Sequence, residues 1–283
     1  MRPEAFFLPA TQGQRFCIFY AAESGSHGGG VRGLVVYIHP FAEEMNKSRR
    51  RAALQSRALA QAGFSVLQID LLGCGDSSGD FGDATWQSWV ADVVQACHWL
   101  RNRSDRGDAG VDAPPLWLWG LRAGCLLAAA AANALTEDCN FLFWQPPATG
   151  KSLLQQFLRL KAAGGMLGGE GKGVMDRLRQ EFAAGSSVEI AGYLLSSELA
   201  SGLERAALVP PSRIERTSRL EWFELSTRQD AGLSPASAAT IANWQQAGFR
   251  VDQHVASGPA FWQTSEIEDA PELLVTTSAA LFS

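Results

Sequence analysis

Short runs of consecutive apolar residues recur along the first half of the chain, and each one ends in a turn-forming segment. Continuous apolar runs of this length are typical of strands that are buried on both faces of a parallel sheet. The predicted strands of this kind are Leu34–Ile38, Phe64–Asp70, the run before Gly120, and Phe141–Trp144.

Segments with helical spacing separate these strands, so the pattern predicts a doubly wound α/β sheet flanked by helices. The turn at Gln12–Gln14 makes Ala5–Tyr20 a hairpin at one edge of the sheet. The predicted helices are Ser48–Ala62, Trp86–Arg101, an alanine-rich helix after Gly124, Pro235–Ala247 and Pro271–Leu281, and two further strands are Leu220–Leu225 and Phe249–Val255.

The region between about Gln145 and Pro211 interrupts the alternation of strands and helices. It has no strand pattern, only helical patterns at Leu153–Ala162, Val174–Phe182 and Ile190–Leu208. We therefore expect an α/β core at 1–144 and 212–283 with an inserted helical lid at 145–211. The glycine-rich stretch Gly164–Gly173 should be the most mobile part of this lid.

Composition narrows the class of protein. The chain has 283 residues, 46% of them hydrophobic, and a net charge of −5, which predicts a globular protein and argues against nucleic acid as a partner. The basic cluster Lys47–Arg51 is interpreted as a solvated helix face. No apolar run is long enough for a signal peptide or a membrane span, so a cytoplasmic location is expected.

Neither a metal nor a cofactor is predicted. The five cysteines are widely spaced, without a C-x-x-C pair or a histidine-rich partner segment, and are interpreted as small buried hydrophobes. The loop Gly73–Gly79 superficially matches a dinucleotide fingerprint, but no helix opens inside it.

The sequence Gly120-Leu121-Arg122-Ala123-Gly124 stands between a predicted strand and a predicted helix. In this context G-x-S-x-G forms the nucleophile elbow, a strained turn that presents a serine. Here the central residue is Arg122, whose guanidinium stays protonated and cannot attack a carbonyl. We expect Arg122 at positive φ.

Taken together, these pieces resemble the α/β-hydrolases. His39-Pro40 stands where that superfamily has its His-Gly loop, Asp70–Gly79 resembles its D-x-x-G-x-G-x-S-x-G loop, and Gly120–Gly124 matches the elbow. The resemblance implies an α/β-hydrolase fold with a mostly parallel central sheet, and hydrolysis of an ester or thioester acyl substrate.

A narrower resemblance is to the exosortase A system-associated hydrolase 2 proteins, a bacterial group. It rests on His39–Lys47, Trp119–Gly124, Trp144–Pro146 and Ala191–Ser196, and so extends into the predicted lid. The genes of that group lie near exosortase and exopolysaccharide clusters, so the resemblance implies a partner in such a system.

Most of the catalytic triad implied by the resemblance is absent. Asp230 fits the position of the acid, after the strand at Leu220–Leu225. The position of the histidine falls on Ala260, and the nearby His254 belongs to the predicted last strand. His254 is retained as a candidate base, although a strand histidine with a structural role is the alternative interpretation.

Other parts of such a site do not depend on the triad. The backbone N–H of Ala123, with that of Phe41 or Ala42, would form an oxyanion-type pocket to which Arg122 adds a positive charge. Alternatively, Arg122 pairs with an internal carboxylate from Asp230, Glu43 or Glu44. The residues expected around the pocket are His39, Phe41, Ala42, Glu43, Glu44, Arg122 and Ala123.

Two functions follow from these features. One is a hydrolase that uses a rearranged site. The other is a catalytically silent protein that binds a small anionic metabolite, or a partner protein of the exosortase or exopolysaccharide system. The absent serine and histidine favour the second, whereas the expected backbone donors and lid keep the first open.

Overall fold

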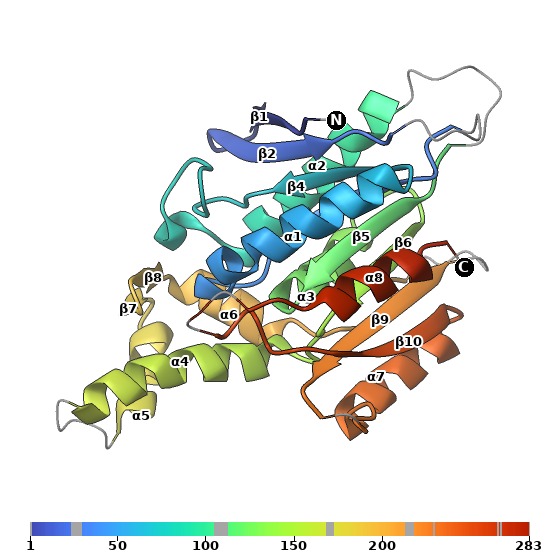
Figure 1. Ribbon diagram of the computed structural model, residues 1–283. Helices are drawn as coiled ribbons and strands as arrows, with labels where there is room; N and C mark the ends of the chain where they lie inside the picture. The colour runs from blue at the N-terminus through green and yellow to red at the C-terminus, as the bar shows by residue number, and fades with distance from the viewer. Residues whose placement is uncertain are drawn as a thin grey trace.

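The computed structural model describes residues 2–23, 30–104, 113–167, 173–212, 218–228, 230–264, 266 and 268–282. Its main sheet has the strand order β1-β2-β4-β3-β5-β6-β9-β10 (Figure 1). Six neighbouring strands, β4, β3, β5, β6, β9 and β10, pair in parallel. The β1–β2 hairpin lies antiparallel at one edge, where β2 pairs with β4. The strands are β1 (Glu4–Pro9), β2 (Gln14–Tyr20), β3 (Gly33–Ile38), β4 (Phe64–Ile69), β5 (Leu116–Leu121), β6 (Cys139–Trp144), β9 (Arg219–Ser226) and β10 (Arg250–Ser257).

Helices cover both faces of this sheet. The helices that alternate with its strands are α1 (Glu43–Gln61), α2 (Trp86–Ser104), α3 (Ala123–Ala132), α7 (Pro235–Gln246) and α8 (Pro271–Ala280), with a short 3₁₀ helix η1 (Phe81–Asp83) before α2. In Figure 1, α1 and α8 lie side by side in front of the sheet, with α2 and α3 behind it.

The alternation of side chains along each strand fills two separate cores. On β3, Leu34, Val36 and Ile38 belong to the hydrophobic cluster that contains α2, α3 and α7. The intervening Val35 and Tyr37 belong to the cluster that contains α1 and α8. Both clusters need apolar residues, which explains why the central strands are apolar without interruption.

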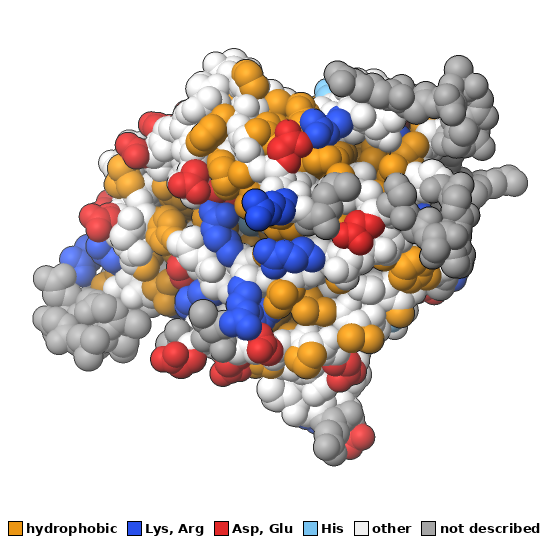
Figure 2. Space-filling view, turned by 45° about the horizontal axis from the view of Figure 1, so that its top comes forward, with side chains coloured by type: hydrophobic (Ala, Val, Ile, Leu, Met, Phe, Trp, Pro, Cys, Tyr) orange, Lys and Arg blue, Asp and Glu red, His pale blue; other side chains and the backbone are white. Residues whose placement is uncertain are grey.

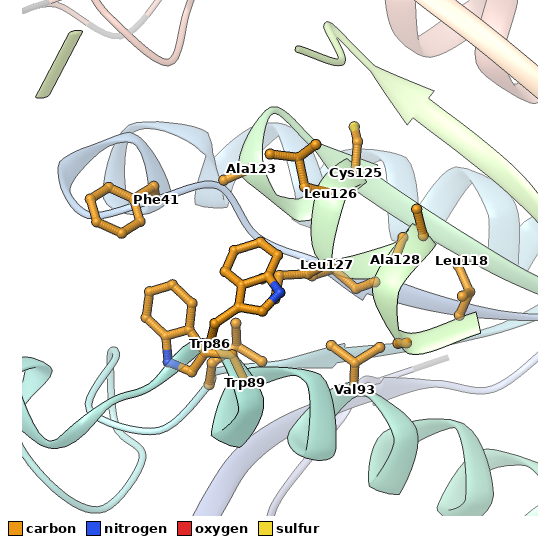
Figure 3. Close-up of a cluster of buried hydrophobic side chains, with 14 of the residues drawn as sticks. Phe41, Trp86, Trp89, Val93, Leu118, Ala123, Cys125, Leu126, Leu127 and Ala128 are labelled. Carbon is orange, nitrogen blue, oxygen red and sulfur yellow. The ribbon is translucent and has the colours of Figure 1, made fainter. Parts of the chain in front are cut away.

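The helix that follows the elbow is anchored in the larger core. Figure 3 shows Leu127 of α3 next to Trp89 of α2, and both side chains are buried. The indole Nε1–H of Trp89 donates to the carbonyl of Leu72 at 3.0 Å, so its burial leaves no unmet donor. Each such side chain contributes about 1.5–3 kcal/mol by leaving water.

The segment between β6 and β9 contains α4 (Gly150–Leu167), α5 (Val174–Ala183), β7 (Val188–Ile190), β8 (Tyr193–Leu195) and α6 (Ser197–Arg205). These elements gather at one end of the molecule (Figure 1). Within the described residues, this segment adds no strand to the main sheet.

The predicted helix at Ile190–Leu208 is wrong in its first part, where β7 and β8 form a hairpin. Its turn residues Ala191 and Gly192 have φ of 50° and 84°, and a two-residue turn with two positive φ angles matches the twist of a hairpin. Each strand has three residues, too few to produce a recognisable alternation. Half of the stretch Gly164–Gly173, for which the greatest mobility was predicted, lies outside the described residues.

Helix α1 begins at Glu43, five residues before the predicted start at Ser48. The additional turn brings Glu43 and Glu44 onto the helix, where acidic residues interact favourably with the N-terminal end of the dipole. The apolar spacing used for the prediction does not reach this turn.

The basic cluster on α1 is only partly a solvated face. Lys47 and Arg50 are exposed, and Figure 2 shows Lys and Arg side chains gathered in the middle of this side of the molecule. Arg51, by contrast, is buried and pairs with Asp269 at 3.0 Å. Among the described helices, none has the length and apolarity required to cross a membrane.

Candidate functional site

Arg122 occupies the sharp turn between β5 and α3, as the sequence predicted. It is the N-cap residue of α3, with φ 54° and ψ −116°, and its N–H donates to the carbonyl of Trp144 at 3.0 Å. A residue other than glycine costs about 1–3 kcal/mol in such a conformation. The turn is therefore held in place by its surroundings.

The two glycines that flank Arg122 allow this turn to be compact. A Cβ atom on Gly120 would lie 2.4 Å from the backbone nitrogen of Cys125, at the start of α3. A Cβ atom on Gly124 would lie 2.1 Å from the carbonyl oxygen of Ile38, at the end of β3. Both contacts are too short for any side chain, so strand and helix can approach this closely only at glycine.

The guanidinium of Arg122 contacts residues from three other parts of the chain. Its Nη2 lies 3.2 Å from Glu44 Oε1 and 2.7 Å from Gln156 Oε1, and its Nε lies 3.4 Å from Glu44 Oε1. Its central carbon lies 5.7 Å from the centre of the Trp262 ring, in cation–π range. Of the three carboxylates expected as internal partners, Glu44 is the one that contacts Arg122.

The environment of Glu44 is protected from water. Burial raises the pKa of the Glu44 carboxyl, while Arg122 and the side chain of Gln263 act in the opposite direction. Removing one partner of such an enclosed pair leaves the other poorly compensated, which is more costly than the net gain of the pair itself.

A pocket of about 270 Å³ opens beside this ion pair. One of its walls comes from α4, whose Leu153, Gln156, Phe157 and Leu160 follow one another at helical spacing on a single face. The full lining consists of Phe41, Glu43, Glu44, Lys47, Leu153, Gln156, Phe157, Leu160 and Gln263. The pocket thus combines an apolar wall with a polar end.

The loop between β3 and α1 supplies backbone donors close to this pocket. Ala42 is the N-cap of α1, with φ 51°, the second strained turn of the site. Within the described chain, no acceptor takes a hydrogen bond from the backbone N–H of Phe41 or Ala42. Ala123 is the first residue of α3, where the N–H has no partner inside the helix. That these N–H groups form an oxyanion-type pocket stays a prediction from the sequence.

His39 has a structural role in the loop after β3. Its Nδ1 lies 2.8 Å from the carbonyl of Pro40, and its Nε2 accepts from the N–H of Leu71 at 3.3 Å. This pattern fits a neutral ring that carries its proton on Nδ1. Burial lowers the pKa of His39, which keeps the ring neutral.

Cys125 is not placed as a substitute nucleophile. The side chain is fully buried, and its Sγ donates to the carbonyl of Gly120 at 3.2 Å. Burial raises the pKa of the Cys125 thiol well above its usual value, so the reactive thiolate is disfavoured. All five cysteines are buried and free of disulfides.

The structure does not join Asp230 and His254 to the elbow. Asp230 lies exposed after β9, and no hydrogen bond or ion pair connects it to Arg122 or to His254. His254 lies within β10, where its Nε2 is 2.9 Å from Glu221 Oε2 and its ring stacks on Phe223. This is the structural arrangement expected of a strand histidine.

Three residues around Arg122 and the pocket were not singled out from the sequence as site residues. Gln156 comes from α4, and Trp262 and Gln263 come from the loop after β10. The resemblance did place the segments that carry these residues near the site. One segment is the lid, and the other is the loop that carries the histidine in the family. Their residue types, however, gave no chemical signal. In the part of the chain that is described, no group of three or more His, Cys, Asp or Glu residues is arranged to hold a metal.

Comparisons with known proteins agree with this architecture. Residues 29–167 match a family model described as serine aminopeptidase, S33. The human protein ABHD12B is 33% identical over 104 residues, which are 37% of this chain and 25% of that protein. The chain therefore matches only about a quarter of the length of this relative.

Solved structures resemble almost the whole chain at low sequence identity. Est1E from Butyrivibrio proteoclasticus has a TM-score of 0.60 at 10% identity, over 98% of this chain and 97% of its own. A thermostable carboxyl esterase from Bacillus coagulans has a TM-score of 0.60 at 14% identity, over 100% of this chain and 98% of its own.

A serine hydrolase from Xanthomonas campestris, described as lacking a lid, has a TM-score of 0.54 at 14% identity, over 99% of this chain and 91% of its own. At these identities the likeness concerns the fold alone. The chain has the α/β-hydrolase fold, and the family model together with these structures supports its place in the α/β-hydrolase superfamily.

Proposed function

We propose that this protein is a binding protein built on the α/β-hydrolase fold, with a catalytic triad that has degenerated. The observation that carries this proposal is the side chain at the elbow. Arg122 replaces the nucleophile and is held there by Glu44 and Gln156. A protonated guanidinium cannot form an acyl-enzyme, and its ion pair fills the place of a serine hydroxyl.

The ligand of this binding protein is a small molecule that enters the 270 Å³ pocket. That volume is slightly below the range of about 300–1,000 Å³ typical of pockets for drug-sized ligands. The anionic ligand expected from the sequence has little support here, because Glu44 already compensates the charge of Arg122. Following the narrower resemblance, we assign the protein to an exosortase or exopolysaccharide system of a bacterial cytoplasm.

Residues 145–211 act in this proposal as the lid over the pocket. Helix α4 supplies the apolar wall, and Gln156 from the same helix bonds to Arg122 at 2.7 Å. This contact ties the helix to the elbow. Since Gln156 is exposed, the bond can open when a ligand enters or leaves.

A hydrolase with a rearranged site is the second candidate function. It is favoured by the backbone N–H groups of Phe41 and Ala42, which have no acceptor among the described residues. Such donors stabilise the oxyanion of an acyl-transfer reaction. Without a nucleophile and a base nearby, however, they account only for binding.

Turnover of p-nitrophenyl esters distinguishes the two functions. The unmodified protein and Arg122→Ser should both be inactive, because the serine alone would have no base to take its proton. Arg122→Ser combined with Ala260→His tests whether supplying both missing groups restores turnover. Turnover by the unmodified protein that persists in Arg122→Ala but disappears in His254→Ala would refute the proposal and identify His254 as a base.

A further inference from the structure

Two consecutive glutamates at the start of α1 differ sharply in their surroundings. Glu44 accepts from Arg122 and interacts with Gln263. Glu43 has a buried Oε2 atom without a hydrogen-bond partner, and no described residue forms an ion pair with its carboxylate. A buried carboxylate oxygen that lacks a donor is unfavourable, so Glu43 is in need of one.

The neighbouring cation does not meet this need. Lys47 is one helical turn after Glu43, the spacing at which a glutamate and a lysine normally pair. Its Nζ instead donates to the backbone carbonyl of Gln263 at 3.4 Å, across the rim of the pocket. The charge of Glu43 therefore remains available to a ligand.

The walls near Glu43 suit an apolar body attached to a positive charge. Phe41 and Phe157 line the same pocket, with their rings edge to face at 5.1 Å, and Leu153 and Leu160 continue the apolar side. Aromatic rings attract organic cations, and a carboxylate next to them supplies the counter-charge. An anion in the same place would face the carboxylate of Glu43.

We propose that this pocket binds the protonated amine of a small molecule with an apolar body, and that Glu43 is its counter-ion. The inference rests on the proposed binding function and specifies the chemical class of its ligand. The ammonium group donates to Glu43, while the hydrocarbon part lies against Phe157 and Leu160. The pair of Arg122 and Glu44 stays intact and forms the polar end of the pocket.

Three probes with the same chain length test the charge. Hexylammonium, 1-hexanol and hexanoate are titrated into the purified protein near pH 7, where a primary alkylamine is protonated as lysine is. We expect hexylammonium to bind at least tenfold more tightly than 1-hexanol, and hexanoate to bind most weakly. Equal affinity of the three probes, preference for hexanoate, or no binding of hexylammonium would overturn the proposal.

Variants locate the binding. Glu43→Gln, which has nearly the same shape, should weaken hexylammonium binding at least tenfold, and the matched control Glu181→Gln, at an exposed position on α5, should leave it unchanged. Leu160→Ala should weaken hexylammonium more than methylammonium, which provides a second readout if Glu43→Gln fails to fold. If Glu43→Gln and Leu160→Ala both kept full affinity for hexylammonium, the amine would bind elsewhere, and the proposal would be overturned.

The outcome can be separated from that of the proposed function. Ester turnover by the unmodified protein would refute the binding function whatever the amine titration shows. Conversely, an inactive protein that prefers hexanoate would keep the binding function and refute only the cationic ligand.

Discussion

Two clusters of charged residues in this molecule are assembled from different kinds of segments. In one, Arg122 pairs with Glu44 at 3.2 Å beside the pocket, under the ring of Trp262. In the other, the fully buried Glu221 pairs with Arg219 at 2.6 Å and with His254 at 2.9 Å. Both place a glutamate, an arginine and an aromatic ring together, but they arise in different ways.

The cluster around Glu221 is built from neighbours in the sheet. Arg219 precedes Glu221 by two positions on β9, so both side chains point to the same face. His254 comes from the adjacent strand β10, which pairs with β9 in parallel register. All three residues lie on strands, and in the described part of the chain no hydrogen bond or ion pair joins Glu221 or His254 to Arg122. We interpret it as a structural cluster of the sheet edge.

The cluster around Arg122 is built from segments far apart in the sequence. Its members come from the elbow, the first turn of α1, helix α4 and the loop after β10. These segments meet at the carboxyl ends of β3 and β5, the two neighbouring strands that lead into α1 and α3. In α/β folds, sites form at this end of the strands. The comparison teaches that a charged cluster can form between neighbouring strands of a sheet, or from helices and loops that are distant in the sequence.

The largest expected effect concerns the cluster in the sheet. Glu221→Ala removes, from a fully buried position, the carboxylate that pairs with Arg219 and His254. We expect the free energy of unfolding to fall by about 3–5 kcal/mol, as for other broken buried pairs. This loss is measured by urea unfolding, monitored by tryptophan fluorescence. A loss below about 1 kcal/mol would mean that this cluster is not structural.

The cluster at the pocket should respond less strongly and depend on pH. Arg122→Ala should lower the free energy of unfolding by about 1–3 kcal/mol near pH 7, because Glu44 then keeps its charge without its cation.

Glu44 has a raised pKa in the folded protein, so folding favours its protonated form. The contribution of Glu44 to stability is then greatest below the ordinary pKa of glutamate and is lost as pH rises through the folded pKa. In Arg122→Ala this pKa rises further, and the fall with pH should be steeper. In the double variant with Glu44→Gln, the additional pH dependence should disappear. If it persisted, another group would be responsible.

The smallest effect belongs to a residue that the sequence put forward as the triad acid. Asp230 is exposed and makes no ion pair with Arg122 or His254. Asp230→Ala should therefore change the free energy of unfolding by less than about 0.5 kcal/mol, and hexylammonium binding not at all. A marked loss of either would show that Asp230 belongs to one of the two clusters.

Sequence reasoning performed well where structure follows from local pattern. The uninterrupted apolar strands, the hairpin at the sheet edge and the position of Arg122 at a positive φ were all predictable. In each case a short stretch carries the necessary signal, such as the glycines at 120 and 124, where a Cβ atom would lie within 3 Å of neighbouring backbone atoms.

The site was predictable only in part, because its contacts join distant segments. The sequence offered three carboxylates for Arg122, and only the packing of α1 against the elbow selects Glu44. Gln156 depends on how α4 lies over the sheet, which no local pattern encodes. The hairpin at β7 and β8 was missed because its two strands are too short for periodicity.

The central claim is that the elbow of this α/β-hydrolase fold carries no activated nucleophile, and it can be tested by intact-protein mass spectrometry. The purified protein is incubated with an alkyl fluorophosphonate, which reacts with activated serines. The account predicts an unchanged mass, because Arg122 occupies the nucleophile position. A stoichiometric adduct on any serine, lost on prior denaturation of the protein, would contradict the account and reveal a working hydrolase site elsewhere in the fold.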